Sequence, residues 1–205
     1  MDKKVYSGKT YEEAVDAAKI DLQELEEDLI IHEISNEKGG LFKSSKVEIE
    51  VISKRDILPF LKDFITKIIK NMGLDVQVET KVKDDIPYIT VYSDDNAILI
   101  GKNGRTMESI ALVARQALQN ELGSHYKFQL DVGDYKVKRQ KNLERLAKKT
   151  AREVYNTNIP VKLEPMNSYE RRIIHAILAD NPKITTASEG EEPNRCVVIS
   201  KVEED

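Results

Sequence analysis

The chain has 205 residues, of which 33% are charged and 40% hydrophobic, and its formal net charge is −4. This composition is typical of a soluble globular protein and excludes fibrous and wholly disordered classes. The single cysteine, Cys196, excludes an internal disulfide framework and a cysteine-based zinc cluster. No apolar signal segment follows Met1, and no apolar run approaches the ~20 residues of a membrane span. We therefore expect a cytoplasmic protein without direct membrane insertion.

Charge is distributed unevenly along the chain. Residues 1–53 carry 7 basic and 13 acidic residues, residues 54–133 carry 11 of each, and residues 134–205 carry 14 basic and 12 acidic residues. Within the last part, residues 136–152 hold eight basic residues against Glu144 alone. Such a stripe is typical of phosphate contact, although the solvated face of an ordinary helix has the same composition.

In chain order, the first 53 residues predict a β-α-β-β module. Residues 5–7 are typical of a short strand, and Thr10 ahead of two glutamates is typical of a helix N-cap. Apolar residues then recur at helical spacing as far as Leu22. Residues 29–35 and 46–52 are rich in β-formers and predict two further strands.

Residues 54–133 predict the order α-β-β-α-α-β. The periodicity of apolar residues and the positions of Gly and Pro set the element bounds. The expected elements are a helix over residues 57–72, strands over 76–82 and 88–92, helices over 95–99 and 105–122, and a strand over 128–132.

Residues 134–205 predict two helices and a small sheet. A long helix covers residues 134–156, and a second helix covers residues 168–178, with strands over 184–188 and 196–202. Their apolar stripes are expected at Leu143, Leu146, Ala147, Val154 and Tyr155 in the long helix and at Tyr169, Ile173, Ala176 and Ile177 in the second.

The first candidate site is the loop Gly101-Lys102-Asn103-Gly104, followed by Arg105. Two glycines permit a tight turn, and the loop amides and the following helix N-terminus favour phosphate oxygens. A G-x-x-G tetrapeptide alone is equally consistent with an ordinary turn. Its place between two strands and two helices resembles the KH domain, whose G-x-x-G loop clamps about four nucleotides. The resemblance implies a type II KH fold, with Ile98, Ile100 and part of residues 88–92 as candidate walls of the base groove.

The second candidate site is the pair Arg171 and His175, which share one helix face at a spacing of four residues. An isolated pair of this kind is more often a surface arginine and a packed histidine. The longer context, from Leu163 to His175 and on to Arg195, resembles the R-x-x-x-H ("R-three-H") domain that is associated with single-stranded polynucleotides. The resemblance implies that Arg171, His175 and Arg195, on the neighbouring strand, contact nucleic acid.

The N-terminal residues extend the resemblance to the whole chain. The opening from Val5 to Ala14, and the segment Lys38-Gly39-Gly40-Leu41-Phe42, resemble the N-terminal domain of the bacterial Jag family, also called the KhpB or EloR family. The family usually has a further glycine after the phenylalanine, where this chain has Lys43. The implied fold is α/β (α+β), with three modules in series over residues 1–53, 54–133 and 134–205.

The resemblance implies an RNA-binding regulator of bacterial cell elongation, division and envelope biogenesis, with no cofactor and no metal. The expected partners are single-stranded RNA, a small KH-only protein of the KhpA type and, functionally, a membrane-protein insertase. Homodimer formation is left open. The basic helix, with Lys138, Arg145 and Lys149, is expected to run between the two RNA-binding modules.

Two other classes of function stay open on the residues alone. The first is a protein-interaction adaptor whose nucleic-acid modules serve as scaffold, with the acidic N-terminal module as a docking surface. The second is a hydrolase that uses His175 with Glu170 or Glu164, although the sequence lacks a nucleophile or a metal set to accompany them. We expect no enzyme activity.

Overall fold

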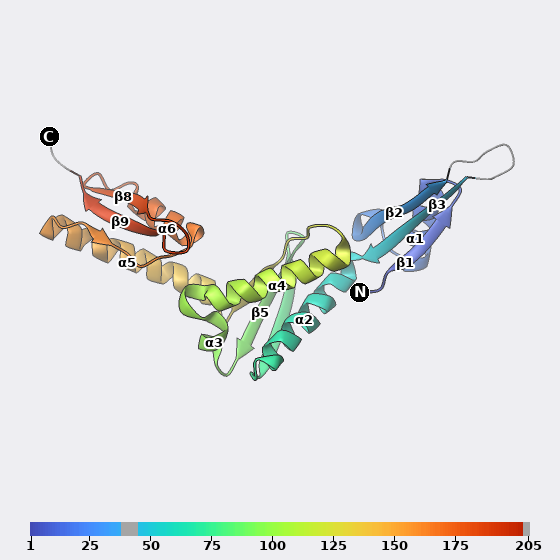
Figure 1. The fold of residues 1–205 in the computed structure, drawn as a ribbon, viewed down its shortest axis with the longest axis horizontal. Helices are drawn as coiled ribbons and strands as arrows, with labels where there is room; N and C mark the ends of the chain where they lie inside the picture. Colours follow the sequence, from blue (N-terminus) through green and yellow to red (C-terminus); the bar gives the residue numbers. More distant parts are fainter. Residues whose placement is uncertain (38–44, 203–205) are drawn as a thin grey trace. The chain divides into compact units, whose positions relative to one another are not determined.

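The computed structural model describes residues 1–37 and 45–202 of the chain. They form two compact units, Met1–Gly133 and Asp134–Asp205, and contain three small three-stranded sheets (Figure 1). The predicted mixed α/β class is confirmed. The expected segment from Lys38 to Phe42 lies outside the described residues.

The first unit begins with a β-α-β-β arrangement, as predicted. Its elements are β1 (Lys4–Gly8), α1 (Tyr11–Leu22), β2 (Leu29–Glu37) and β3 (Lys46–Ser53). The strands form an antiparallel sheet in the order β1-β3-β2. The Thr10 side chain accepts a hydrogen bond from the Glu13 amide and so caps α1. Small and apolar residues of α1, such as Ala14 and Ala18, pack against Ile49 and its neighbours on β3.

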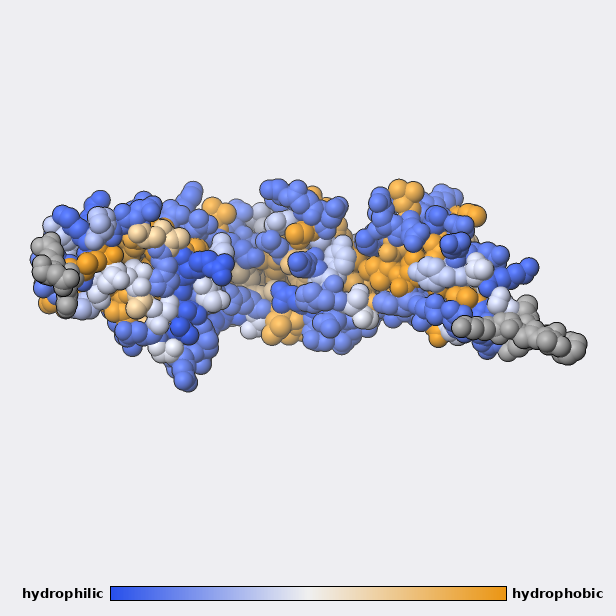
Figure 2. Space-filling model, turned by 90° about the horizontal axis from the view of Figure 1, so that it is seen from above, coloured by the Kyte–Doolittle hydropathy of each residue, from blue (hydrophilic) through white to orange (hydrophobic). Residues whose placement is uncertain are grey.

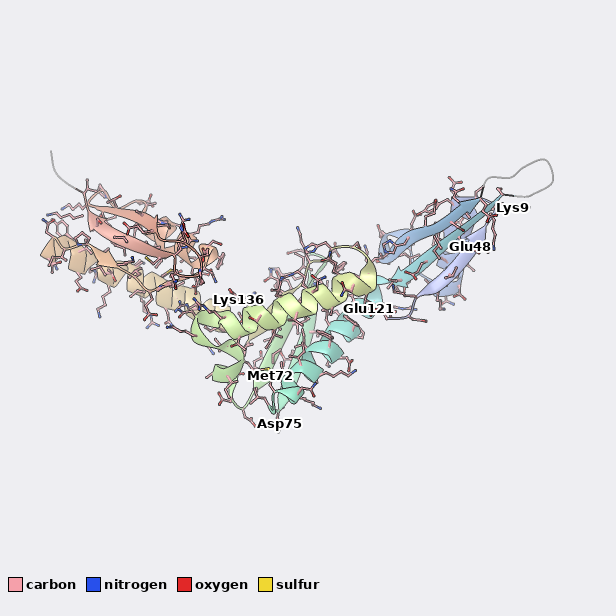
Figure 3. The ribbon with its side chains drawn as sticks, in the orientation of Figure 1. Lys9, Glu48, Met72, Asp75, Glu121 and Lys136 are labelled. Atoms are coloured by element: carbon pink, nitrogen blue, oxygen red, sulfur yellow. The ribbon has the colours of Figure 1, made fainter. Side chains whose placement is uncertain are left out.

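The rest of the first unit has the predicted α-β-β-α-α-β order that is typical of a type II KH domain. Its elements are α2 (Ile57–Asn71), β4 (Val76–Lys83), β5 (Ile86–Ser93), α3 (Asn96–Ile100), α4 (Arg105–Leu122) and β6 (Gln129–Val132). The sheet order is β4-β5-β6, with β5 and β6 parallel. Figure 3 labels Met72 and Asp75 at the turn between α2 and β4.

One face of this sheet is buried and the other is open. Ile89 and Val91 on β5 are fully buried, as is Leu61 on α2. The alternate residues Tyr88 and Tyr92 are only partly buried, because successive side chains of a strand point to opposite faces. Helices α2 and α4 contact each other, so the pair closes the core of this part of the chain.

The second unit packs two helices on a sheet. Its elements are α5 (Tyr135–Thr157), β7 (Val161–Lys162), α6 (Ser168–Leu178), β8 (Ile184–Glu189) and β9 (Cys196–Lys201), in an antiparallel sheet of order β7-β9-β8. Its core joins Leu143 on α5 and Ile174 on α6 to Ile199 on β9. Cys196 is fully buried and its thiol lies 3.8 Å from the Glu189 carbonyl oxygen.

The helix stripes of this unit agree in part with those expected: Leu143, Ala147 and Val154 on α5 are buried, and Ile173 and Ile177 on α6 pack against the core. Leu146 and Tyr155 on α5, and Tyr169 and Ala176 on α6, are exposed rather than buried. The buried residues of α6 are instead Glu170, Ile174 and Leu178. The buried face of α6 thus includes Ile174, with Ile173 and Ile177 partly buried beside it, and also Glu170, whose burial as half of an ion pair hydrophobicity alone does not indicate.

Hydrophilic residues cover most of the surface drawn in Figure 2, and hydrophobic residues reach it in patches. Among the helices of residues 1–37 and 45–202, none combines the length and hydropathy that crossing a bilayer requires. In the same residues, no cluster of His, Cys, Asp and Glu has an arrangement that could hold a metal ion.

Candidate nucleic-acid interface

The glycine loop is a tight turn between α3 and α4. Gly101 has φ of 68° and ψ of −176°, and a Cβ built on it would lie 2.1 Å from the Thr106 hydroxyl oxygen. A side chain at this position would therefore be both strained and in collision with α4. Asn103 has φ of 54°, and Gly104, with φ of 78°, is buried at the start of α4. The sequence thus sets a backbone shape in which little besides glycine fits at position 101.

Apolar side chains precede this turn on α3, and basic side chains lie in it and directly after it. Lys102 and Arg105 are exposed, next to the amides that begin the 18-residue helix α4. Ahead of the turn, on α3, Ile98 is 51% exposed and Ile100 is partly buried, whereas Leu99 between them is fully buried. Exposure of Ile98 is consistent with its expected place in a groove wall. Within residues 88–92, Ile89 and Val91 belong to the core and cannot line a groove.

The second candidate site is formed by α6 and β8. His175 Nδ1 lies 2.6 Å from the Thr186 hydroxyl oxygen, and Nε2 lies 2.8 Å from the Ser188 hydroxyl oxygen. Thr186 and Ser188 are two residues apart on β8 and therefore share one face of the strand. Burial of the imidazole, together with the positive charge of Arg171, lowers the pKa of His175 below its usual value. In the protein alone, the site therefore favours a neutral histidine.

Arg171 is engaged by the protein itself. Its Nε donates to the Met166 carbonyl oxygen over 3.3 Å, and its Nη2 lies 2.6 Å from the Glu192 carboxylate. Only 11% of the Arg171 side chain is exposed, compared with 59% for Glu192. A phosphate that approaches this guanidinium would compete with the more exposed partner of the pair, Glu192.

Arg195 was expected on a strand, but it lies directly before β9. Its carbonyl oxygen accepts a hydrogen bond from the Met166 amide over 3.1 Å. Among the described residues, its buried Nε atom has no hydrogen-bond partner. The main chain of Met166 therefore contacts both arginines. Its carbonyl oxygen accepts from the Arg171 side chain, and its amide donates to the Arg195 carbonyl oxygen. The structure brings Arg171 and His175 together on α6 and attaches Arg195 at the neighbouring turn.

The basic stripe on α5 lies opposite the buried face of the helix. Lys138, Arg145 and Lys149 are exposed, at spacings of seven and four residues that keep them on one side. Lys136 projects from the first turn of the same helix (Figure 3). Arg139 differs, because its Nε lies 2.6 Å from the Glu170 carboxylate, whose side chain is only 5% exposed. Arg139 thus has a structural role and is distinct from the exposed cations of the stripe.

The residues that sequence reasoning missed are the partners of the R-x-x-x-H pair. Thr186 and Ser188 carry hydroxyls at strand spacing, and this alternation is a signal that could have placed them opposite a helix residue. Glu192 lies 21 residues from Arg171 in a turn between β8 and β9, and no periodicity marks it.

Comparison with known proteins places these features in a family. The family model of the R-three-H domain matches residues 141–201, which include Arg171, His175 and Arg195. The RNA-binding protein KhpB of Clostridium symbiosum is 34% identical over 204 residues, which cover 98% of this chain and 92% of that protein. The chain belongs to the KhpB family.

Two further KhpB proteins support this assignment. The RNA-binding protein KhpB of Bacillus subtilis (strain 168) is 32% identical over 204 residues, with 95% of this chain and 96% of that protein covered. The KhpB of Lactiplantibacillus plantarum is 37% identical over 140 residues, which cover 68% of this chain but only 44% of that longer protein. The expected resemblance to the family is confirmed over nearly the whole chain.

Proposed function

We propose that this KhpB-family chain binds single-stranded RNA at two sites, the glycine loop and the α6–β8 face, and acts as a regulator rather than an enzyme. The family relatives carry the name RNA-binding protein, which supports the ligand class. The three modules would occupy residues 1–53, 54–133 and 134–205. Control of cell elongation, division and envelope biogenesis is the cellular role that we assign to this binding.

The observation that carries the proposal is the turn at Gly101. Its backbone approaches α4 closely, exposes Lys102 and Arg105, and lies beside the exposed side chain of Ile98. Positive charge and amides suit the phosphates of a strand, while an apolar edge suits unstacked bases. A single strand offers both groups at once, whereas the bases of a duplex are stacked and out of reach.

The α6–β8 face would add a second contact. Arg171 offers a guanidinium and Arg195 a buried Nε atom without a described partner, while His175 is held by two hydroxyls. An RNA strand that reaches this face would displace Glu192 from Arg171. The basic face of α5, with Lys138, Arg145 and Lys149, would contribute sequence-independent attraction to phosphates.

We assign the remaining partners by charge and by family. The acidic N-terminal module should repel nucleic acid, so we propose that it docks onto protein. A small KH-only protein of the KhpA type, a functional link to a membrane-protein insertase and a homodimer are further proposals for this chain. Scaffolding by an adaptor is the alternative, and it predicts no RNA affinity at the loop.

The test replaces Lys102 and Asn103 together by Asp in the full chain. Both glycines are kept, so the turn persists, and two carboxylates repel the phosphates. We expect single-stranded RNA to bind at least about tenfold more weakly in fluorescence anisotropy, with little change in melting temperature. The matched control replaces Lys70 and Asn71 by Asp, because this exposed Lys-Asn pair lies at the end of α2, away from the glycine loop in the sequence. Equal affinity of wild type and loop variant would exclude the glycine loop as an RNA site.

A further inference from the structure

A cavity of about 310 Å³ lies on the C-terminal unit, between α5, the end of α6 and the turn that follows it. It shares no lining residue with the Arg171–His175 site. Its lining combines apolar, aromatic and basic side chains, namely Lys148, Ala151, Arg152, Tyr155, Ile177, Leu178, Asn181 and Lys183. The α5 members recur at spacings of three and four residues, so they form one stripe of the helix.

Tyr155 forms an aromatic wall of this pocket. Tyr155 is 41% exposed, while the pocket residues Ala151 and Leu178 are buried and provide an apolar floor. The Lys183 ammonium donates to the Tyr155 hydroxyl over 3.1 Å and lies 4.8 Å from the ring centroid. The Lys201 ammonium lies 5.3 Å from the same centroid. The ring is therefore held in place by two cations and still offers surface to a ligand.

The pocket also gathers several positive charges. In the part of the chain that the structure describes, Lys148, Arg152 and Lys201 form no ion pair with a carboxylate, and no acidic residue lines the pocket. The arginines Arg139 and Arg171 of the same unit are, in contrast, each paired with a glutamate. Cations gathered in this way repel one another, and an anionic ligand would relieve that repulsion.

From this combination we infer that the pocket binds a nucleotide, with its base against Tyr155 and the apolar floor and its phosphate between Lys148, Arg152 and Lys183. Inorganic phosphate would leave the aromatic wall unused, and an uncharged apolar ligand would leave the cations unused. A nucleotide satisfies both, and 310 Å³ is at the lower end of the range for small-ligand pockets. Base stacking on an aromatic side chain and phosphate contact are the two components of single-strand binding.

This nucleotide belongs to a bound RNA strand, so the inference rests on the proposed RNA binding. The exposed cations Arg145 and Lys149 lie on the same helix as the pocket residues Lys148 and Arg152. A strand attracted to the basic face of α5 would thus reach the pocket without leaving the helix. A free nucleotide has the same chemistry, so the experiment includes both.

The test measures binding of a fluorescein-labelled single-stranded RNA to the full chain and to variants of the pocket. Tyr155→Leu keeps an apolar side chain but removes the ring, and Arg152→Gln removes one charge. We expect each to weaken RNA binding about tenfold, the size of one lost stacking or charged contact. Tyr155→Phe keeps the ring and should retain most of the affinity. Matched controls are Tyr169→Leu, which removes a 65% exposed tyrosine on α6, and Lys162→Gln, an exposed lysine on β7.

A second measurement places the base directly. RNA that contains 4-thiouridine should crosslink on irradiation to the peptide that carries Tyr155, and the crosslink should be lost in Arg152→Gln. AMP and UMP are titrated in parallel. If they bind the wild type and not Tyr155→Leu while RNA affinity is the same in both, the occupant is a free nucleotide and the RNA form of the inference is overturned.

The two proposals can fail separately. Wild-type chain that binds no RNA would overturn the proposed function. Wild-type chain that binds RNA, together with pocket variants of equal affinity and no mononucleotide binding, would overturn the nucleotide pocket alone.

Discussion

Arg171 and Glu192 form an ion pair in which the guanidinium Nη2 and the carboxylate Oε1 are 2.6 Å apart, although 21 residues separate them in the chain. The arginine of the R-x-x-x-H motif is therefore neutralised before any ligand arrives. Glu192 is the more exposed member, so an incoming phosphate competes with a carboxylate that can turn toward solvent. The binding free energy at Arg171 is therefore the difference between its interaction with the phosphate and its interaction with Glu192. It is smaller than the attraction that an unpaired arginine would provide.

Replacing Glu192 by Gln should raise the affinity for single-stranded RNA about two- to fivefold. A partly exposed pair contributes about 0.5–1 kcal/mol, and that cost of displacement disappears with the carboxylate. Anisotropy titration at one salt concentration measures the change. The neighbour Glu191 is exposed as well, and Glu191→Gln removes the same charge without touching Arg171. An equal gain in both variants would mean that only the net charge matters.

Reversing Lys138, Arg145 and Lys149 to Glu should flatten the salt dependence of RNA binding. Each phosphate neutralised on a single strand contributes a log–log slope of about −0.7, so three lost contacts change the slope by about 2. Binding constants at several salt concentrations give the slope. A triple reversal at Lys3, Lys9 and Lys19, in the N-terminal module, alters net charge equally and should leave the slope as in wild type. If the α5 stripe is only the solvated face of a helix, both triple variants will show the wild-type slope.

Acid should destabilise the protein in part through His175. The pKa of this histidine is lowered by burial and by Arg171, so below about pH 6.5 the unfolded chain takes up a proton that the folded chain resists. The stability from the neutral imidazole is complete above that pH and is lost as pH falls toward the lowered pKa. Melting temperatures at about pH 7.5 and 5.5 should therefore differ less in His175→Gln than in wild type. The exposed His125, changed to Gln, provides the control, and an identical difference in all three proteins would contradict the assignment.

Glu170→Ala should lower the free energy of unfolding by about 3–5 kcal/mol. The carboxylate accepts from Arg139 and also completes the capping box with Asn167, so its loss leaves a partly buried arginine without its carboxylate. Denaturant unfolding followed by circular dichroism measures the change. Glu164→Ala serves as the comparison, because that exposed glutamate precedes the helix. A loss below about 1 kcal/mol would show that Arg139 finds another partner.

Local signals were enough to predict most helices and strands of this chain, although not the two-residue strand β7. Helix α6 runs from Ser168 to Leu178, as expected, because Asn167 and Glu170 close a capping box whose residues are near each other in sequence. The turn at Gly101 could be predicted in the same way, because its two glycines and the apolar periodicity of the flanking segments are local features of the sequence.

The contacts within the site could not be predicted in the same way. Glu170 is buried on α6, where it pairs with Arg139, 31 residues earlier in the chain, whereas Tyr169 and Ala176 are exposed. Arg195 lies before β9 rather than on it, and Glu192 reaches Arg171 across the β8–β9 turn. These are tertiary pairings of polar groups, and neither hydrophobic periodicity nor motif spacing carries information about them.

Complete burial of Cys196 on β9 makes the single thiol of this chain a built-in reporter. A maleimide can reach the sulfur only when the sheet of the C-terminal unit opens. The rate of labelling therefore reports how often that unit opens. RNA that binds the folded C-terminal unit would slow this labelling, and RNA held solely at the glycine loop would not. Labelling of this natural cysteine can thus show whether a ligand protects the C-terminal unit, with no mutation.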